Sequence, residues 1–282
     1  VLAWFGLVRG DLDPRTFASQ ILFYYNYYAI YGDAGTSVGG FALLWSLSVE
    51  EHFYLIWPAL FLFFARDRLR IAHLLALLVA ILAWRGYRFL AWGDSEWVIY
   101  SLTDTRFDSL LYGCLLALLE WRGQARRLFP ASTGAALALC GLGLAVILAS
   151  FLWRDALFRS TLRYSLQGIA LMPIFHYAVS RADSPLARPL NWAWVRQLGV
   201  WSYVIYLSHF VLVDFGQQLG LADGSPALML LTAALTVGWA ALVYALVEKP
   251  LKPLRSRLTG HRPAAAPPAA AGLPQPGPGG GA

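Results

Sequence analysis

Charged side chains are scarce in this sequence. Asp, Glu, Lys and Arg make up only 13% of the 282 residues, whereas 58% are hydrophobic and the mean hydropathy is +0.54. A soluble globular domain is about 25% charged and about 45–50% apolar. The composition therefore excludes an ordinary soluble domain and predicts an integral membrane protein embedded in the lipid bilayer.

Cysteine is nearly absent too. Cys114 and Cys140 both lie inside apolar runs, so we expect them to be small core residues that offer neither a disulfide framework nor a metal-binding motif. Basic residues outnumber acidic ones and the net charge is +6, but they fall in short loops between apolar runs. That placement is typical of membrane topology and not of nucleic-acid binding.

Long apolar runs take the place of the missing charge. A helix of about 20 apolar residues crosses the ~30 Å hydrocarbon core because each residue adds about 1.5 Å. About seven runs approach this length, which predicts an all-α fold, a polytopic bundle of transmembrane helices. The runs are 41–64, 71–92, 98–119, 131–153, 162–180, 197–219 and 227–247. The tyrosine-rich segment 17–31 fits an interfacial or re-entrant segment, and the sequence leaves its helicity open.

The loops between the runs alternate in charge. Basic residues fall in every second loop, and the opposing loops hold acidic residues such as Asp94 and Glu96. The positive-inside rule therefore predicts a multi-pass protein of the inner (plasma) membrane with a cytoplasmic C-terminus. Residues 1–250 form the predicted transmembrane domain, and 251–282, rich in Pro, Ala and Gly, are the predicted disordered cytoplasmic tail. The basic residues that set this orientation are Arg66, Arg68, Arg70, Arg122, Arg126, Arg127, Arg181, Arg188, Lys249, Lys252, Arg255 and Arg257.

Two carboxylates and an imidazole interrupt the first run. Glu50, Glu51 and His52 lie about ten residues from its outer end, which is about 15 Å and close to the membrane midplane. Charged groups in hydrocarbon are costly unless they are paired or hydrated, so they usually mark a functional site. Helical spacing places Ser46 and Tyr54 on the same face as Glu50.

Two further runs bring polar groups to a similar depth. Arg106 and Asp108 would lie about 200° apart around a helix, so they cannot face the same neighbour. Either one binds a ligand while the other holds the fold, or both form structural ion pairs. His209 lies at a similar depth, with Tyr206 on its face, and we expect the three helices to share a polar cavity.

The polar stretch of the first run also resembles a known family signature. Ser46-Leu47-Ser48-Val49-Glu50-Glu51-His52-Phe53-Tyr54-Leu55-Ile56-Trp57-Pro58 closely resembles the signature of the acyltransferase 3 family of membrane O-acyltransferases. Segments 106–113, 203–209 and 243–250 are similar to later motifs of that family, in family order. The resemblance implies a ten-helix domain that transfers an acyl group, commonly acetyl, from acetyl-CoA or another acyl-CoA to a hydroxyl of a glycan or similar acceptor. It implies no bound cofactor.

The resemblance also assigns roles to residues. The family's first helix carries an arginine motif and a catalytic histidine that are not found here, and the chain opens on Val1, so we expect about three N-terminal helices to be missing. Glu50 or Glu51 would then orient or charge that histidine as the base, with His52 as a weaker candidate, and Arg106 would bind a phosphate of coenzyme A or the developing negative charge. The predicted catalytic residues are Glu50, Glu51 and His52, and the predicted substrate contacts are Arg106, Asp108, Ser46, Tyr54, Tyr206 and His209.

A proton-coupled transporter or glycan flippase would also bury glutamate, arginine and histidine at the membrane midplane. Such a protein is expected to show two repeated halves with Gly- or Pro-broken helices in matching positions. The sequence shows no such repeat, so acyl transfer is the favoured prediction and transport the alternative. The acceptor and the acyl chain stay open.

Overall fold

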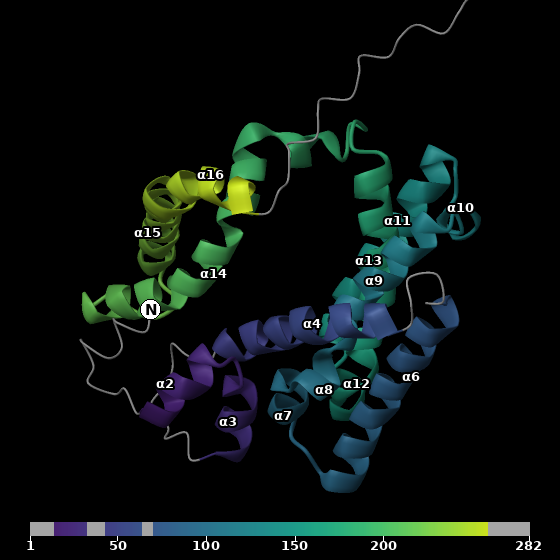
Figure 1. The fold of residues 1–282 in the computed structure, drawn as a ribbon, viewed down its shortest axis with the longest axis horizontal. Helices are drawn as coiled ribbons and strands as arrows, with labels where there is room; N and C mark the ends of the chain where they lie inside the picture. Colours follow the sequence, from purple (N-terminus) through teal and green to yellow (C-terminus); the bar gives the residue numbers. More distant parts are fainter. Residues whose placement is uncertain (1–13, 33–42, 64–69, 259–282) are drawn as a thin grey trace, which may run out of the picture. The chain divides into compact units, whose positions relative to one another are not determined.

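The computed structural model describes residues 14–32, 43–63 and 70–258, and every regular element within these ranges is a helix (Figure 1). The all-α prediction is therefore confirmed. The chain divides into two compact units, Val1–Gly199 and Val200–Ala282, which are described separately. The predicted domain boundary at residue 250 stays a prediction, as does the disordered tail, of which residues 259–282 lie outside the described ranges.

The first unit holds most of the helices. They are α2 (Pro14–Ile21), α3 (Tyr25–Tyr31), α4 (Leu44–Phe63), α6 (Ile71–Tyr87), the π-helical turn η3 (Arg88–Trp92), α7 (Glu96–Ser101), α8 (Thr103–Arg106), α9 (Asp108–Trp121), α10 (Ala125–Leu128), α11 (Thr133–Leu152), α12 (Ala156–Ser160), α13 (Leu162–Ser180) and the 3-10 turn η4 (Arg188–Asn191). Helix α14 (Ala193–Gln218) runs across the boundary between the units. The second unit continues with α15 (Pro226–Val243), the π-helical turn η5 (Tyr244–Glu248) and α16 (Lys249–Leu258).

Four of the described helices are long and apolar enough to cross a membrane. They span Ile71–Trp92, Thr133–Leu152, Ala193–Gln218 and Pro226–Pro253, and each overlaps a predicted run. Helices α4 and α13 are 20 and 19 residues long, but polar side chains make them less apolar, such as Glu50 and Glu51 in α4 and Arg163 and Gln167 in α13. The chain is a membrane protein, and the total of seven spans stays a prediction.

The run at 98–119 does not form one continuous helix, so that prediction is wrong. Helix α7 ends at Ser101, Leu102 is extended (φ −83°, ψ 145°), and α8 is only four residues long. The Thr105 hydroxyl lies within hydrogen-bond distance of the carbonyl oxygens of Ile99 (2.7 Å) and Leu102 (3.0 Å). Threonine hydroxyls compete in this way with the helical backbone for its hydrogen-bonding groups, which favours a break.

The segment whose helicity the sequence left open forms two short helices, α2 and α3. They are joined through Phe23, which has a positive φ of 57°. This is the left-handed region that non-glycine residues seldom adopt. The turn brings Asn26 of α3 into a fully buried position.

Helix α9 forms the centre of the apolar core in the first unit. Leu111, Leu115 and Leu119 recur every four residues along it and pack in one cluster with Leu74 and Leu78 of α6. On another side α9 packs closely against α13. A Cβ atom added at Gly168 of α13 would lie 2.2 Å from the Tyr112 ring, so this glycine permits the close approach of the two helices.

Candidate functional site

Polar side chains from several helices converge on the broken run. We call residues 101–108, which link α7 to α9 through α8, the junction segment. Backbone groups freed by a helix break must find other partners when they are buried. Side chains from α3, α4, α6 and α13 supply contacts to this segment.

His52 is anchored to the junction segment. Its Nδ1 lies 2.7 Å from the Thr103 hydroxyl oxygen. Asn26 donates from Nδ2 to the same oxygen at 2.9 Å and to the Ser101 carbonyl at 3.3 Å. These bonds tie α3 and α4 to the start of α8, and they hold the imidazole in one place.

The two carboxylates beside His52 are not consumed by the fold. Glu50 is exposed at the surface of the first unit and Glu51 is half-buried, and neither forms an ion pair with any residue in the described ranges. Tyr54, one helical turn from Glu50, is 59% exposed. The Ser46 hydroxyl donates to the Leu43 carbonyl at 3.0 Å. The face of α4 that carries Glu50 and Tyr54 is therefore exposed on the first unit.

Asp108 forms a fully buried ion pair with Arg85. Its Oδ2 lies 2.8 Å from Arg85 Nη1, and the two side chains are 1% and 0% exposed. Arg85 also donates to the Thr105 carbonyl at 3.1 Å and to the Ser165 hydroxyl at 2.6 Å. One guanidinium thus links α6, the junction segment, α9 and α13, which favours the structural alternative for Asp108.

Asp104 is the centre of a second polar cluster at the junction segment. Its carboxylate accepts hydrogen bonds from Trp84 Nε1 (2.7 Å), Arg88 Nη1 (2.9 Å) and the Tyr27 hydroxyl (3.1 Å). Arg88 also pairs with Asp94 at 2.5 Å. Burial, together with the negative charge of Asp104, raises the pKa of Tyr27 to about 12, so this phenol donates as a neutral group.

Arg106 forms no salt bridge with Asp108, although Arg85, the partner of Asp108, lies over the same aromatic ring, that of Tyr164, at 5.3 Å. The Arg106 guanidinium lies 4.0 Å from the centroid of this ring and 5.2 Å from the centroid of Tyr100. Its Nη1 is buried and has no hydrogen-bond partner among the described residues. The side chain lines a cavity of about 570 Å³ whose wall also includes Arg159 and Arg163.

His209 and Tyr206 belong to the second unit. His209 Nδ1 lies 2.7 Å from the Tyr206 carbonyl oxygen and 3.3 Å from that of Ile205. A carbonyl oxygen can only accept, so Nδ1 carries the proton. In the neutral ring, Nε2 is then the basic nitrogen. The cavity shared by three helices stays a prediction, because it would join residues of both units.

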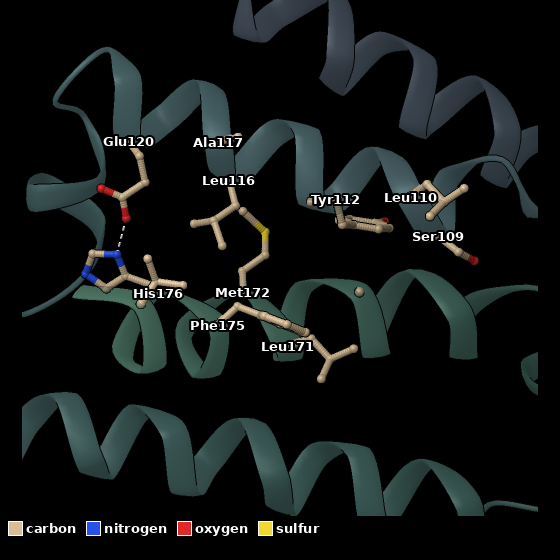
Figure 2. A pocket seen from close by; sticks show the side chains of 13 residues that line it. Ser109, Leu110, Tyr112, Leu116, Ala117, Glu120, Leu171, Met172, Phe175 and His176 are labelled. Atoms are coloured by element: carbon tan, nitrogen blue, oxygen red, sulfur yellow. Dashed lines mark hydrogen bonds and ion pairs between the residues drawn. The ribbon is translucent and has the colours of Figure 1, made fainter. Parts of the chain in front are cut away.

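A second cavity, of about 430 Å³, lies between α9 and α13. Figure 2 shows apolar side chains such as Leu116, Met172 and Phe175 along it and the ion pair between His176 and Glu120 at one end. The His176 ring also stacks on Phe129 at 4.4 Å. None of the predicted catalytic residues lines this cavity.

The sequence predictions missed several residues of the site. Arg85 and Arg88 lie within the apolar run 71–92. Because charge is costly in such a run, their position could have marked them as functional or structural polar residues. Asp104 stands two residues before Arg106 in a stretch already rich in polar groups. No pattern in the sequence marked Asn26 as a partner of the junction segment, because that contact joins residues 75 or more positions apart.

Comparison with known proteins gives a consistent result. The profile of the acyltransferase 3 family, described as an acyltransferase domain, matches residues 15–246. YrhL of Bacillus subtilis (strain 168), provisionally named a peptidoglycan O-acetyltransferase, is 31% identical over 263 residues, which cover 87% of this chain and 40% of YrhL. The peptidoglycan O-acetyltransferase OatA of Listeria monocytogenes is 27% identical over 220 residues, which cover 74% of this chain and 35% of OatA.

The O-acetyltransferase OatA of Staphylococcus aureus (strain NCTC 8325 / PS 47) is 26% identical over 220 residues, which cover 74% of this chain and 36% of that protein. The chain thus spans well under half the length of these curated relatives. No solved structure matches the chain significantly.

Proposed function

Since the chain belongs to the acyltransferase 3 family, we propose that it is the membrane domain of an O-acyltransferase, most simply an O-acetyltransferase. In this proposal the acyl group comes from acetyl-CoA or another acyl-CoA, and the acceptor is a hydroxyl of a cell-surface glycan. The names of the relatives, which include peptidoglycan O-acetyltransferases, support a glycan acceptor.

The observation that carries the proposal is that the two carboxylates of the family signature on α4 are not used in ion pairs with described residues. Glu50 and Glu51 stand beside His52 with no ion pair to a described residue, whereas Asp104 and Asp108 are both engaged with arginines. Carboxylates that the fold does not use remain available for proton transfer or for orienting a base.

The chemistry needs a base and a group that stabilises an oxyanion. The acceptor hydroxyl passes its proton to the base as its oxygen bonds to the thioester carbonyl carbon. The tetrahedral oxyanion then collapses, the C–S bond breaks, and the proton goes to the thiolate of coenzyme A.

Residues of α4 fit these tasks. The base is a histidine, for which His52 is the candidate on α4, and Glu50 or Glu51 orients and charges it. Tyr54, on the same exposed face as Glu50, supplies a hydroxyl that can donate to the oxyanion. Thr103 and Asn26 are positioning residues, because they act on the acceptor only through His52.

The two substrates approach from opposite sides in this proposal. The alternation of basic and acidic loops supports a cytoplasmic side with Arg122, Arg126 and Arg127, where acyl-CoA is present. The loops that contain Asp94, Glu96 and Arg159 then face the other side, where the glycan lies.

The test is acyl transfer from labelled acetyl-CoA by membranes that contain the full-length protein, with and without peptidoglycan as acceptor. We expect Glu50→Gln or Glu51→Gln to lower the rate by about 10²–10⁴-fold, the usual contribution of acid–base catalysis. Glu120→Gln is the matched control, because Glu120 pairs with His176 away from α4, and it should keep the rate within about twofold. Unchanged transfer in both α4 variants would overturn the assignment, and uptake of labelled glycan into vesicles without acylation would favour transport.

A further inference from the structure

The cavity at Arg106 has the composition of a binding site for an acidic sugar. It measures about 570 Å³ and is walled by α7, α8, α12 and α13 together with the end of α11. Three arginines and one glutamate line it, namely Arg106, Arg159, Arg163 and Glu96, so three positive charges less one negative charge leave an excess of two. Tyr100 and Tyr164 form aromatic walls beside them.

The acidic side chains nearby do not neutralise this charge. Glu96 pairs with Arg159 at 3.0 Å, and both side chains are 37% exposed. Asp108 is taken by Arg85. Arg163 donates to the Tyr164 hydroxyl at 3.1 Å, and no salt bridge joins Arg163 or Arg106 to an acid in the part of the chain that the structure describes.

Arg106 lacks both a hydrogen-bond partner for Nη1 and a salt bridge among the described residues. Its Nη1 is shielded from solvent and has no hydrogen-bond partner in the described ranges, although a buried guanidinium is costly without a counter-ion. The Tyr164 ring at 4.0 Å compensates only in part, since a cation–π contact contributes about 0.5–2 kcal/mol. A carboxylate or phosphate in the cavity would complete its bonding, because the planar guanidinium binds such groups through two parallel hydrogen bonds.

The cavity is adjacent to the proposed catalytic face. Arg106 follows Thr103, the anchor of His52, by three residues on α8, a rise of about 4.5 Å. The Tyr100 ring, on the cavity wall, packs against Trp45 of α4 with ring centroids 4.5 Å apart. A ligand bound at Arg106 is therefore within reach of the α4 signature.

We propose that this cavity is the acceptor subsite, in which the arginines bind a carboxylate or phosphate of the glycan and Tyr100 contacts the sugar ring. This rests on the proposed function and assigns Arg106 to the acceptor rather than to coenzyme A. In the predicted topology Glu96 and Arg159 belong to the loops on the non-cytoplasmic side, where a cell-surface glycan would be found and coenzyme A would be absent. Aromatic faces also suit the C–H face of a sugar ring.

The first test is binding, which does not depend on turnover. The probes are N-acetylmuramic acid and its methyl ester, and the readout is the fluorescence of Trp97, which lines the cavity, in the full-length protein with Trp97→Phe as the blank. We expect the acid to bind at least about tenfold more tightly than the ester, and Arg163→Gln and Arg106→Gln to abolish this preference. Equal binding of acid and ester to the wild-type protein would overturn the subsite.

The second test is kinetic and separates the two substrates. Arg163→Gln and Arg106→Gln should raise KM for an acidic glycan about tenfold or more and leave KM for acetyl-CoA unchanged. A rise in KM for acetyl-CoA instead would assign the cavity to the donor and overturn the proposal. If Arg106→Gln does not fold, the KM values of Arg163→Gln alone test the proposal. The Arg163 side chain lies at the cavity wall and forms no ion pair with a described residue.

The two proposals can fail independently. Loss of transfer in Glu51→Gln with no change in the arginine variants would keep the acyltransferase and reject the subsite. Acid-selective binding that depends on Arg163, in a wild-type protein without transferase activity, would keep the subsite and reject the enzyme.

Discussion

The junction segment has arginines on two sides, and they are used in opposite ways. Towards α6, Arg85 and Arg88 are ion-paired with Asp108, Asp104 and Asp94. We call this the paired side. Towards α12 and α13, which we call the open side, Arg106 and Arg163 have aromatic neighbours but form no salt bridge with a described acid. The comparison shows that neighbouring guanidinium groups can either hold helices together through ion pairs or remain available to bind a ligand. Only the partners of each group distinguish the two roles.

Breaking the paired side at its most buried point should have the largest effect. Asp108→Asn leaves the Arg85 charge fully buried without an acid, which we expect to lower the free energy of unfolding by about 3–5 kcal/mol. The measurement is chemical unfolding of the full-length protein in detergent micelles. Replacing both members, as in Arg85→Met with Asp108→Leu, should recover more than half of the loss, and a double variant as unstable as the single one would contradict this account.

A smaller loss is expected at the second cluster of the paired side. Asp104→Asn weakens three hydrogen bonds, but Arg88 keeps its contact with Asp94. We expect about 1–3 kcal/mol of destabilisation in the same unfolding assay. An effect as large as that of Asp108→Asn would mean that burial does not separate the two clusters.

The pH dependence of the paired side should report Tyr27. Its pKa is raised from 10.0 to about 12, so the neutral phenol contributes stability that is fully present below pH 10 and is lost as the pH rises from 10 through about 12. Tyr27→Phe lacks the hydrogen bond to Asp104 and should be less stable at pH 8 by about 0.5–1.5 kcal/mol. Above pH 10 the difference in Tm between the two proteins should shrink, and parallel curves up to pH 12 would contradict the assignment.

The smallest effect on stability is expected on the open side. Arg163→Gln removes a charge that is not ion-paired within the described ranges, so the free energy of unfolding should change by no more than about 0.5 kcal/mol. Thermal unfolding beside Asp108→Asn gives the contrast directly. A loss above about 2 kcal/mol would show that Arg163 supports the fold and would erase the distinction between the two sides.

Composition and periodicity predicted the class of fold, because hydrophobic runs report burial in lipid or core directly. They placed the helix that carries Glu50 and several spans, but they predicted one continuous helix over 98–119. Hydropathy did not predict the break at Leu102, because it carries no information on which backbone groups form hydrogen bonds with side chains. The break is stabilised by long-range contacts, in which Asn26 and Arg85 donate to the Ser101 and Thr105 carbonyls, and by the local hydrogen bond from the Thr105 hydroxyl to the Ile99 carbonyl.

Site residues could be predicted where a charged residue is unusual in an apolar run. They could not be predicted where the role of a residue depends on a salt bridge to a distant residue. Glu50 and Glu51 stand out in an apolar run, and the structure leaves both without a salt bridge to a described residue. Arg106 and Asp108 look alike in the sequence, yet Asp108 is bound by Arg85, 23 positions away, and Arg106 faces a cavity. Distant pairing of this kind is not encoded in the local pattern.

The break in the helix also has a consequence for the order of synthesis. Asn26 and Arg85, which bond to the Ser101 and Thr105 carbonyls, both precede residue 101 in the chain and leave the ribosome first. The interrupted helix therefore enters the bilayer when two of its hydrogen-bond donors are already made. Ser165 is made later, so the hydrogen bond between α13 and Arg85 can form only after α6 and the junction segment have been synthesised.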